Sequence, residues 1–243
     1  MKKLKHIPTK PKESISRDEI EAKTEELKEQ LFKLQDVFYA SKKYSLLIIL
    51  QGMDTAGKDG TVRHVFSCLN PQGCTVKSFK VPTEEEASHD FLWRIHKETP
   101  AKGMFQIFNR SQYEDILVPT VHELLEGKII EKRYEKINHF ESHLKDNDTI
   151  ILKFFLHISL EEQKHRIEKR LENPDKKWKY SPDDSKDEKY WNTFQKTYEK
   201  VFKNCGKPIS WEIIPADEKW YRNYLIAKKV VEALEELNLE YPK

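Results

Sequence analysis

The chain has few glycines and cysteines, seven and three in 243 residues, and no long hydrophobic run. The cysteines form no C-x-x-C pair, so they indicate neither a disulfide framework nor a zinc site. The longest apolar run, residues 46–50, is too short to span a membrane, and the N-terminal residues lack the apolar segment of a secretory signal. A net charge of +2 gives no general basic surface for nucleic acid. We therefore expect a cytoplasmic protein without a membrane or nucleic-acid partner.

The chain does have a regular alternation of apolar runs and amphipathic stretches. Short apolar runs predict buried strands at 44–51, 74–82, 103–108, 149–158 and 211–216. Helical spacing and capping patterns predict helices at about 17–41, 58–69, 84–93, 112–126, 131–146, from 160 onward, and 218–237. This alternation favours an α/β fold with a doubly wound parallel sheet.

The pattern predicts one domain, residues 16–243, preceded by a flexible arm. Residues 1–15 are basic and contain two prolines, which is typical of a loosely held segment. Ser16 and Ser159 each begin a capping box, and Thr83 precedes an acidic first turn as a helix cap does.

Three of the seven glycines fall within nine residues after the first predicted strand. Gly52, Gly57 and Lys58 match the G-x4-G-K spacing of a phosphate loop, in the strand–loop–helix context that this motif requires. Backbone N–H groups and the helix N-terminus of such a loop bind phosphate oxygens. The alternative is an ordinary glycine-rich turn. The predicted phosphate-binding residues here are Gly52, Ala56, Gly57, Lys58, Asp59, Gly60 and Arg63.

Two carboxylates lie in this loop, and Asp59 stands where a Ser or Thr is usual. Asp54 and Asp59 would repel a phosphate chain unless a cation lay between them. Mg2+ takes one or two carboxylates together with phosphate oxygens and water. We therefore predict Mg2+, with Mn2+ as a substitute, at Asp54 and Asp59, or an acceptor phosphate positioned by them. The alternative for Asp59 is a first-turn acid that interacts with the helix dipole.

A second polar cluster follows the third predicted strand. Asn109 stands where phosphate-loop enzymes carry an Asp that helps hold Mg2+. Arg110 lies at the carboxyl edge of the sheet, where ligands bind, and its planar fork suits phosphoryl oxygens. The alternative is a capping turn with surface charges. The predicted catalytic residues are Asp54, Lys58, Asn109, Arg110 and Glu114, the last as a metal or acceptor contact.

A basic stretch, residues 166–179, follows the fourth predicted strand. Such a run is usually a solvated face, but at this place in a phosphate-loop kinase a mobile lid closes over phosphates. We predict a lid at about 166–190. Its predicted phosphate-binding residues are Arg166, Arg170, Lys176 and Lys179.

Five motifs, in this order, resemble the type-2 polyphosphate kinases: QGMDTAGKDG, KGMFQIFNRSQYED, ILKFFLHIS, RLENPDKKWK and IPADEKWYRN. The resemblance covers roughly residues 16–240. It implies a three-layer α/β/α P-loop kinase fold like that of thymidylate kinase, with a basic lid. It also implies reversible, Mg2+-dependent transfer of phosphoryl groups from inorganic polyphosphate to AMP and ADP, giving ADP and ATP. The resemblance puts Asp54, Lys58 and Asp59 at the reacting phosphates and metal, Asn109, Arg110 and Glu114 beside them, and Arg166, Arg170 and Lys179 on polyphosphate.

Within the family, FNRSxYED resembles the class that acts on nucleoside mono- and diphosphates, whereas FDRSWYN is typical of classes restricted to diphosphates. Asn109 then marks the class, because one negative charge fewer beside the acceptor would admit AMP as well as ADP. Two rival functions are an ATP-dependent nucleoside monophosphate kinase and a non-catalytic polyanion-binding module. We expect a homo-oligomer, with the long first helix either at the interface or packed on its own sheet.

Overall fold

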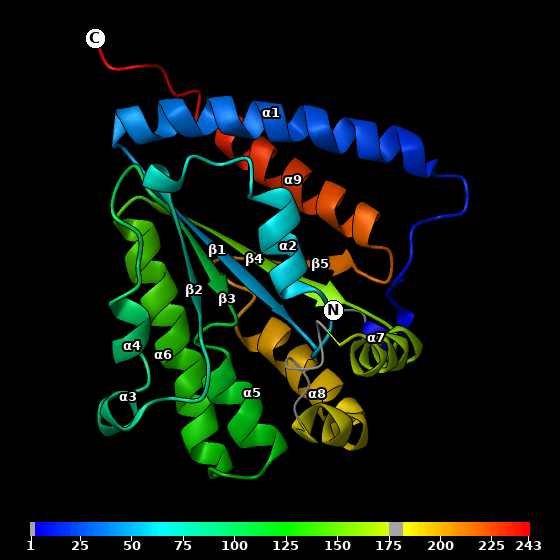
Figure 1. Ribbon diagram of the computed structural model, residues 1–243. Helices are drawn as coiled ribbons and strands as arrows, with labels where there is room; N and C mark the ends of the chain where they lie inside the picture. Colours follow the sequence, from blue (N-terminus) through cyan, green and yellow to red (C-terminus); the bar gives the residue numbers. More distant parts are fainter. Residues whose placement is uncertain (1–2, 175–181) are drawn as a thin grey trace.

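A five-stranded parallel sheet forms the centre of the protein in the computed structural model, which describes residues 3–174 and 182–243. The strand order is β2-β3-β1-β4-β5 (Figure 1). The strands are β1 (Ser45–Gly52), β2 (Cys74–Ser78), β3 (Phe105–Asn109), β4 (Thr149–His157) and β5 (Trp211–Pro215). All neighbouring pairs are parallel, which confirms the predicted sheet.

The central strand explains why the sequence shows no alternation there. Every residue of β1 is buried, because β3 and β4 flank it and helices cover both faces. The edge strand β2 is half-exposed and shorter than predicted, ending at Ser78.

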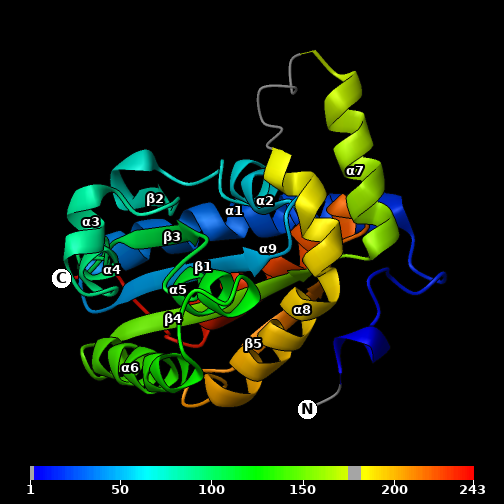
Figure 2. The same cartoon turned by 90° about the horizontal axis from the view of Figure 1, so that it is seen from below.

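Helices cover both faces of the sheet and make three layers (Figures 1 and 2). One layer holds α1 (Arg17–Ser41), α2 (Lys58–Val65) and α9 (Lys219–Glu235). The other holds α5 (Glu114–Val121), α6 (Gly127–Asp146) and α8 (Pro182–Asn204). Two short helices, α3 (Glu84–Ser88) and α4 (Trp93–His96), follow β2, and α7 (Leu160–Glu172) projects from the body. Within the described residues, no helix is both long and apolar enough to cross a membrane.

The helix ends correct two predictions. Ser16 makes no side-chain capping hydrogen bond, so the predicted capping box there is wrong although α1 begins as expected. Thr83 does form a capping box with Glu86, but the helix it starts ends at Ser88. Asp90 accepts a hydrogen bond from the backbone N–H of Leu92 at 3.0 Å, and this local bond competes with a continuous helix.

The N-terminal segment packs against the body, in contrast to the loose arm that the sequence predicts. Leu4 is fully buried in a short 3-10 helix, Leu4–His6. Its N–H donates to Glu199 Oε1 at 2.8 Å, and its carbonyl lies 3.2 Å from His157 Nε2. Thr9 donates to Asp217 Oδ2 at 2.7 Å. These partners lie about 150 to 210 positions away, so local composition does not reveal them.

The topology brings three strand ends together. The chain leaves β1 toward β2 on one side and later crosses to β4 on the other, so β1 is the point at which the winding reverses. In doubly wound sheets, ligands bind at the carboxyl ends of strands at such a point. Leu50 pairs with Asn109, and Gly52 pairs with Leu156, which places the ends of β3 and β4 beside the start of the glycine-rich loop.

Candidate active site

The glycine-rich loop joins β1 to α2, as the spacing predicts. Gly57 has φ +102°, which disfavours other residues, and a Cβ there would lie 1.9 Å from Arg222 Nη1. A Cβ at Gly52 would lie 2.8 Å from the carbonyl oxygen of Leu156. Gly57 is therefore required by its backbone conformation. At both Gly52 and Gly57, a Cβ would also collide with neighbouring atoms.

Lys58 is the first residue of α2, and its side chain folds back over the loop. Its ammonium donates to the carbonyls of Gly52 at 2.8 Å and Met53 at 3.2 Å. Burial, and second the nearby Arg110, lowers the pKa of Lys58 to about 8, while Asp54, Glu114 and Asp59 oppose this shift. At neutral pH the lysine is still mostly a cation, in the position that the motif predicts for phosphate contact.

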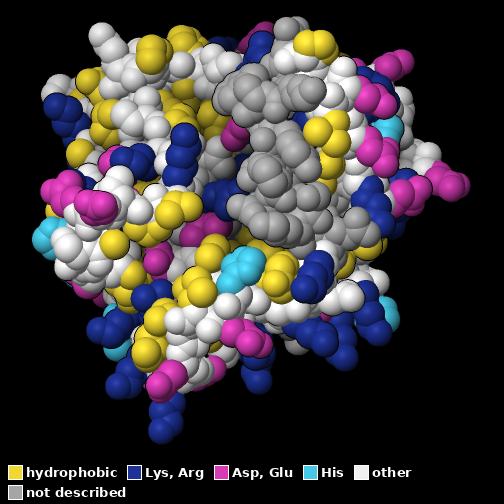
Figure 3. Space-filling view, turned by 60° about the horizontal axis from the view of Figure 1, so that its bottom comes forward, with side chains coloured by type: hydrophobic (Ala, Val, Ile, Leu, Met, Phe, Trp, Pro, Cys, Tyr) yellow, Lys and Arg dark blue, Asp and Glu magenta, His cyan; other side chains and the backbone are white. Residues whose placement is uncertain are grey.

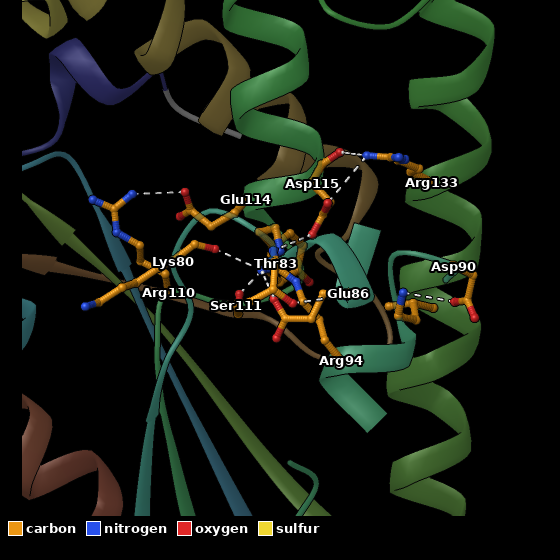
Figure 4. A network of polar contacts seen from close by, with 12 residues as sticks. Lys80, Thr83, Glu86, Asp90, Arg94, Arg110, Ser111, Glu114, Asp115 and Arg133 are labelled. Atoms are coloured by element: carbon orange, nitrogen blue, oxygen red, sulfur yellow. Dashed lines mark hydrogen bonds and ion pairs between the residues drawn. The ribbon is translucent and has the colours of Figure 1, made fainter. Parts of the chain in front are cut away.

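Arg110 joins the loop to α5. Its Nη2 lies 2.6 Å from Asp54 Oδ1, and its Nη1 lies 3.1 Å from Glu114 Oε2. Figure 4 shows the second of these contacts from close by. These two carboxylates raise the pKa of Arg110, Glu114 contributing most, so the guanidinium stays charged. Arg110 also has φ +65°, a left-handed conformation that is uncommon outside glycine.

Asn109 contacts the other loop carboxylate. Its Nδ2 donates to Asp59 Oδ1 at 2.6 Å, linking the end of β3 to the first turn of α2. An Asp at position 109 would place a second carboxylate against Asp59, so the amide is the group that allows this contact. The structure thus brings together all five predicted catalytic residues: Asp54, Lys58, Asn109, Arg110 and Glu114.

The carboxylates of Asp54 and Asp59 are suited to a metal ion that takes most of its ligands from phosphates. The described part of the chain contains no cluster of three or more His, Cys, Asp or Glu side chains that would hold a metal alone. Mg2+ in phosphate sites takes one or two carboxylates and obtains its other ligands from phosphate and water. Asp54 and Asp59, both beside Lys58, match that donor set.

Arg166 has a different place from the one predicted for it. It is buried at 8% exposure, and its guanidinium donates to four backbone carbonyls. These belong to Thr55 (2.9 Å), Ala56 (3.1 Å), Ala216 (2.7 Å) and Asp217 (2.8 Å). Its Nε lies 2.6 Å from Glu162 Oε1. Arg166 therefore ties the phosphate loop to the end of β5, whereas the sequence predicts a side chain that grips phosphate.

Arg222 is a site residue that the sequence reasoning misses. It lies on α9, is buried, and donates to the carbonyl of Ala56 at 3.3 Å. Burial, and second Arg166, lowers its pKa to about 10. Its position in the motif IPADEKWYRN is the one signal in the sequence, because nothing local links residue 222 to residue 57.

The other predicted binding residues are spread more widely. Gly60 faces Arg222: a Cβ added at Gly60 would lie 3.4 Å from Arg222 Nη2. Arg63 is exposed on α2. Arg170 is half-buried on α7, four residues after Arg166. Lys176 and Lys179, with the middle of the predicted lid, lie outside the described residues. Figure 3 shows acidic and basic side chains close together in a recess left of the middle of the face seen there.

A further polar network lies beside this site, under α5. Arg94 of α4 donates to Asp115 Oδ2 at 3.2 Å and to the carbonyl of Lys80 at 2.8 Å (Figure 4). Arg133 of α6 also donates to the backbone of Asp115. Burial raises the pKa of Asp115 although Arg94 opposes the shift. These contacts fasten the segment after β2 to the start of α5, next to Glu114.

Comparison with known proteins agrees with this geometry. The chain is 46% identical over 218 residues to an AMP/ADP-polyphosphate phosphotransferase from Meiothermus ruber, covering 89% of this chain and 82% of that protein. It is 40% identical over 228 residues to an ADP-polyphosphate phosphotransferase from Rhodopseudomonas palustris, covering 88% and 79%.

A solved structure and a family model match this chain over most or all of its length. The crystal structure of polyphosphate kinase 2 from Arthrobacter aurescens TC1 matches with a TM-score of 0.96 at 39% identity, covering all of this chain and 88% of that one. The fold is accordingly the three-layer α/β/α P-loop kinase fold that the resemblance implies. The model of the family described as "Polyphosphate kinase 2 (PPK2)" matches residues 14–242. The chain therefore belongs to the polyphosphate kinase 2 family.

Proposed function

We propose that the protein transfers phosphoryl groups from inorganic polyphosphate to AMP and ADP, in either direction. The observation that carries this proposal is the convergence of Lys58, Arg110 and two carboxylates on one phosphate loop. The site occurs in a chain similar along most of its length to an AMP/ADP-polyphosphate phosphotransferase.

In the proposed reaction, a phosphate oxygen of AMP or ADP attacks the terminal phosphorus of polyphosphate in line. A new P–O bond forms as the bond to the next phosphate breaks, and the shortened polyphosphate keeps the electron pair. The attacking oxygen is already ionised at neutral pH, so no general base is required. The protein's part is positioning and charge neutralisation. Lys58 and Arg110 supply positive charge beside the loop, where it stabilises the transferring group.

Membership of the polyphosphate kinase 2 family, whose members act on nucleotides, implies that the reaction needs a divalent metal. We propose that Asp54 and Asp59 hold Mg2+, with Mn2+ as a substitute. When bound, the metal would neutralise part of the negative charge of the phosphates. Asp54 also holds Arg110 at 2.6 Å, so the same carboxylate orients the guanidinium.

In this proposal, the backbone of the phosphate loop and several basic side chains bind polyphosphate. The backbone of Gly52, Gly57 and Gly60 supplies N–H groups, and Arg63, Arg170, Lys176 and Lys179 supply charge along the chain of phosphates. The N–H of Ala56, also predicted to bind phosphate, donates instead to the carbonyl of Met53 at 3.1 Å and so shapes the loop. Arg166 acts through the loop that it supports.

Asn109 is proposed to set the acceptor class. It adds no charge beside Asp59, and a nucleoside diphosphate carries more negative charge than a monophosphate. The similar proteins carry both kinds of name, AMP/ADP-polyphosphate phosphotransferase and ADP-polyphosphate phosphotransferase. The cytoplasmic location and the homo-oligomer stay predictions from the sequence.

A phosphate-transfer assay with polyphosphate and Mg2+ tests the function, with AMP and ADP offered separately and no ATP added. We expect ADP and then ATP to appear from AMP. Turnover of ADP alone would keep the polyphosphate donor but refute the class assigned through Asn109. No turnover with either acceptor, together with turnover of ATP and a nucleoside monophosphate, would refute the proposed donor.

A further inference from the structure

Two buried charges lie in the interior between β4 and α6, behind the site. Lys153 of β4 is 1% exposed and Glu141 of α6 is fully buried, and their Nζ and Oε2 atoms are 2.7 Å apart. A buried ion pair loses so much hydration that it contributes little net stability, and apolar side chains often serve as well. The pair therefore calls for an explanation beyond stability.

Within the described residues, both hydrogen bonds to Glu141 Oε1 come from the turn that follows Arg110. The hydroxyl of Tyr113 donates to this oxygen at 2.6 Å, and Gln112 Nε2 donates to it at 3.1 Å. Lys153 donates to Tyr113 Oη at 3.1 Å and to the carbonyl of Cys205 at 2.7 Å. The carboxylate thus holds two consecutive residues of one turn, and the ammonium holds the carboxylate.

Arg110 itself needs such support. Its φ of +65° is a conformation that costs about 1 kcal/mol or more for a residue with a Cβ, and it persists where the surroundings impose it. On one side, its N–H donates to the carbonyl of Leu50 at 3.0 Å. On the other, Ser111 Oγ accepts from Gln51 Nε2 at 3.1 Å, and Gln112 and Tyr113 are held by Glu141.

We propose that Glu141, fixed by Lys153, is a positioning residue for Arg110. Through Gln112 and Tyr113 it holds the left-handed turn that directs the guanidinium toward Asp54 and the phosphate loop. This inference rests on the role of Arg110 in the proposed function. Glu141 lies too deep in the interior to touch a substrate, so it acts through the turn alone.

The interior contains a matched control for the hydroxyl of Tyr113. Tyr134 of α6 is 3% exposed, and its hydroxyl makes no hydrogen bond within the described residues. Tyr113→Phe removes a hydroxyl that belongs to the network, while Tyr134→Phe removes one that does not. Neither variant leaves a buried charge unpaired, so both are expected to fold, whereas Glu141→Ala would leave the buried ammonium of Lys153 without its carboxylate.

We expect Tyr113→Phe to lower kcat about tenfold, because a small misplacement of a catalytic group has a large effect on rate. The KM for polyphosphate should change less than about threefold, since the phosphate loop is untouched. Tyr134→Phe should keep wild-type kcat. Equal kcat values for both variants would overturn the proposal, whatever their melting temperatures.

A double-variant cycle with Arg110→Lys separates positioning from a general loss of structure. Arg110→Lys alone should lower kcat strongly, and adding Tyr113→Phe should then lower it less than about twofold further. A full additional tenfold loss would show that Tyr113 acts independently of Arg110 and would overturn the inference. Wild-type kcat in Arg110→Lys would refute the proposed role of Arg110 itself, and the inference with it.

Discussion

Arg222 occupies the space in which a side chain at residue 57 would begin. Its Nη1 lies 1.9 Å from the Cβ position of Gly57, and it donates to the neighbouring carbonyl of Ala56 at 3.3 Å. A residue of the last helix thereby supports the phosphate loop from behind. Arg166 supports the same loop through the carbonyls of Thr55 and Ala56.

Gly57→Ala should disable the loop. The new methyl group would displace Arg222, and the φ of +102° adds backbone strain, so the free energy of unfolding should fall by about 2 kcal/mol or more. Turnover should fall at least about a hundredfold. Gly127→Ala is the control, because a Cβ there meets nothing within 4 Å. Urea unfolding and the transfer assay check both variants, and near-wild-type behaviour of Gly57→Ala would contradict the account of Arg222.

Lys58 should make activity fall at alkaline pH. Its pKa in the free protein is lowered to about 8, and the charged form is the one that binds phosphate, so kcat/KM should be flat at neutral pH and decline above about pH 8. Bound phosphate favours the ammonium, so the decline in kcat should appear at higher pH.

The control for this pH profile is Lys58→Arg. Arginine stays charged throughout the range, so the decline in kcat/KM near pH 8 should disappear even if overall activity is lower. A decline that persists in Lys58→Arg would assign the titration to another group.

Arg166 should contribute to the stability of the fold, whereas Arg170 should contribute to polyphosphate binding. Lysine cannot reach the four carbonyls that Arg166 holds, so Arg166→Lys should lower the free energy of unfolding by about 2 kcal/mol and lower kcat as well. Arg170→Lys, four residues further along α7, should leave stability within about 0.5 kcal/mol and raise the KM for polyphosphate. Thermal unfolding and initial rates distinguish the two patterns, and an unchanged stability in Arg166→Lys would contradict the supporting role.

Asn109→Asp should shift acceptor preference toward ADP. The substitution replaces the 2.6 Å hydrogen bond to Asp59 by a repulsion between two carboxylates. The ratio of kcat/KM for AMP to that for ADP should fall about tenfold or more. Combining it with Asp59→Asn restores an amide–carboxylate pair and tests whether the added charge is the cause. An unchanged ratio in Asn109→Asp would refute the interpretation of Asn109 as a class marker.

Local pattern was sufficient to locate the strands, apart from the end of β2, and the phosphate loop, and to predict that the five catalytic candidates lie close together. A buried parallel strand reads as a continuous apolar run, as at Leu46–Leu50, and the loop spacing follows from the short path between a strand and a helix. Asn109 and Arg110 were predictable because parallel strands end at one edge of the sheet.

Contacts between distant segments depended on the tertiary structure. The anchoring of Leu4, the place of Arg222 behind Gly57, and the Glu141–Lys153 pair beneath the Arg110 turn all join residues far apart in sequence. Arg166 shows the same limit, since its basic surroundings suggest a solvent-facing lid while its guanidinium is buried among backbone carbonyls. Hydrophobic periodicity in the sequence indicates which face of a helix or strand is buried. The residues that this face contacts depend on how the layers pack in the tertiary structure.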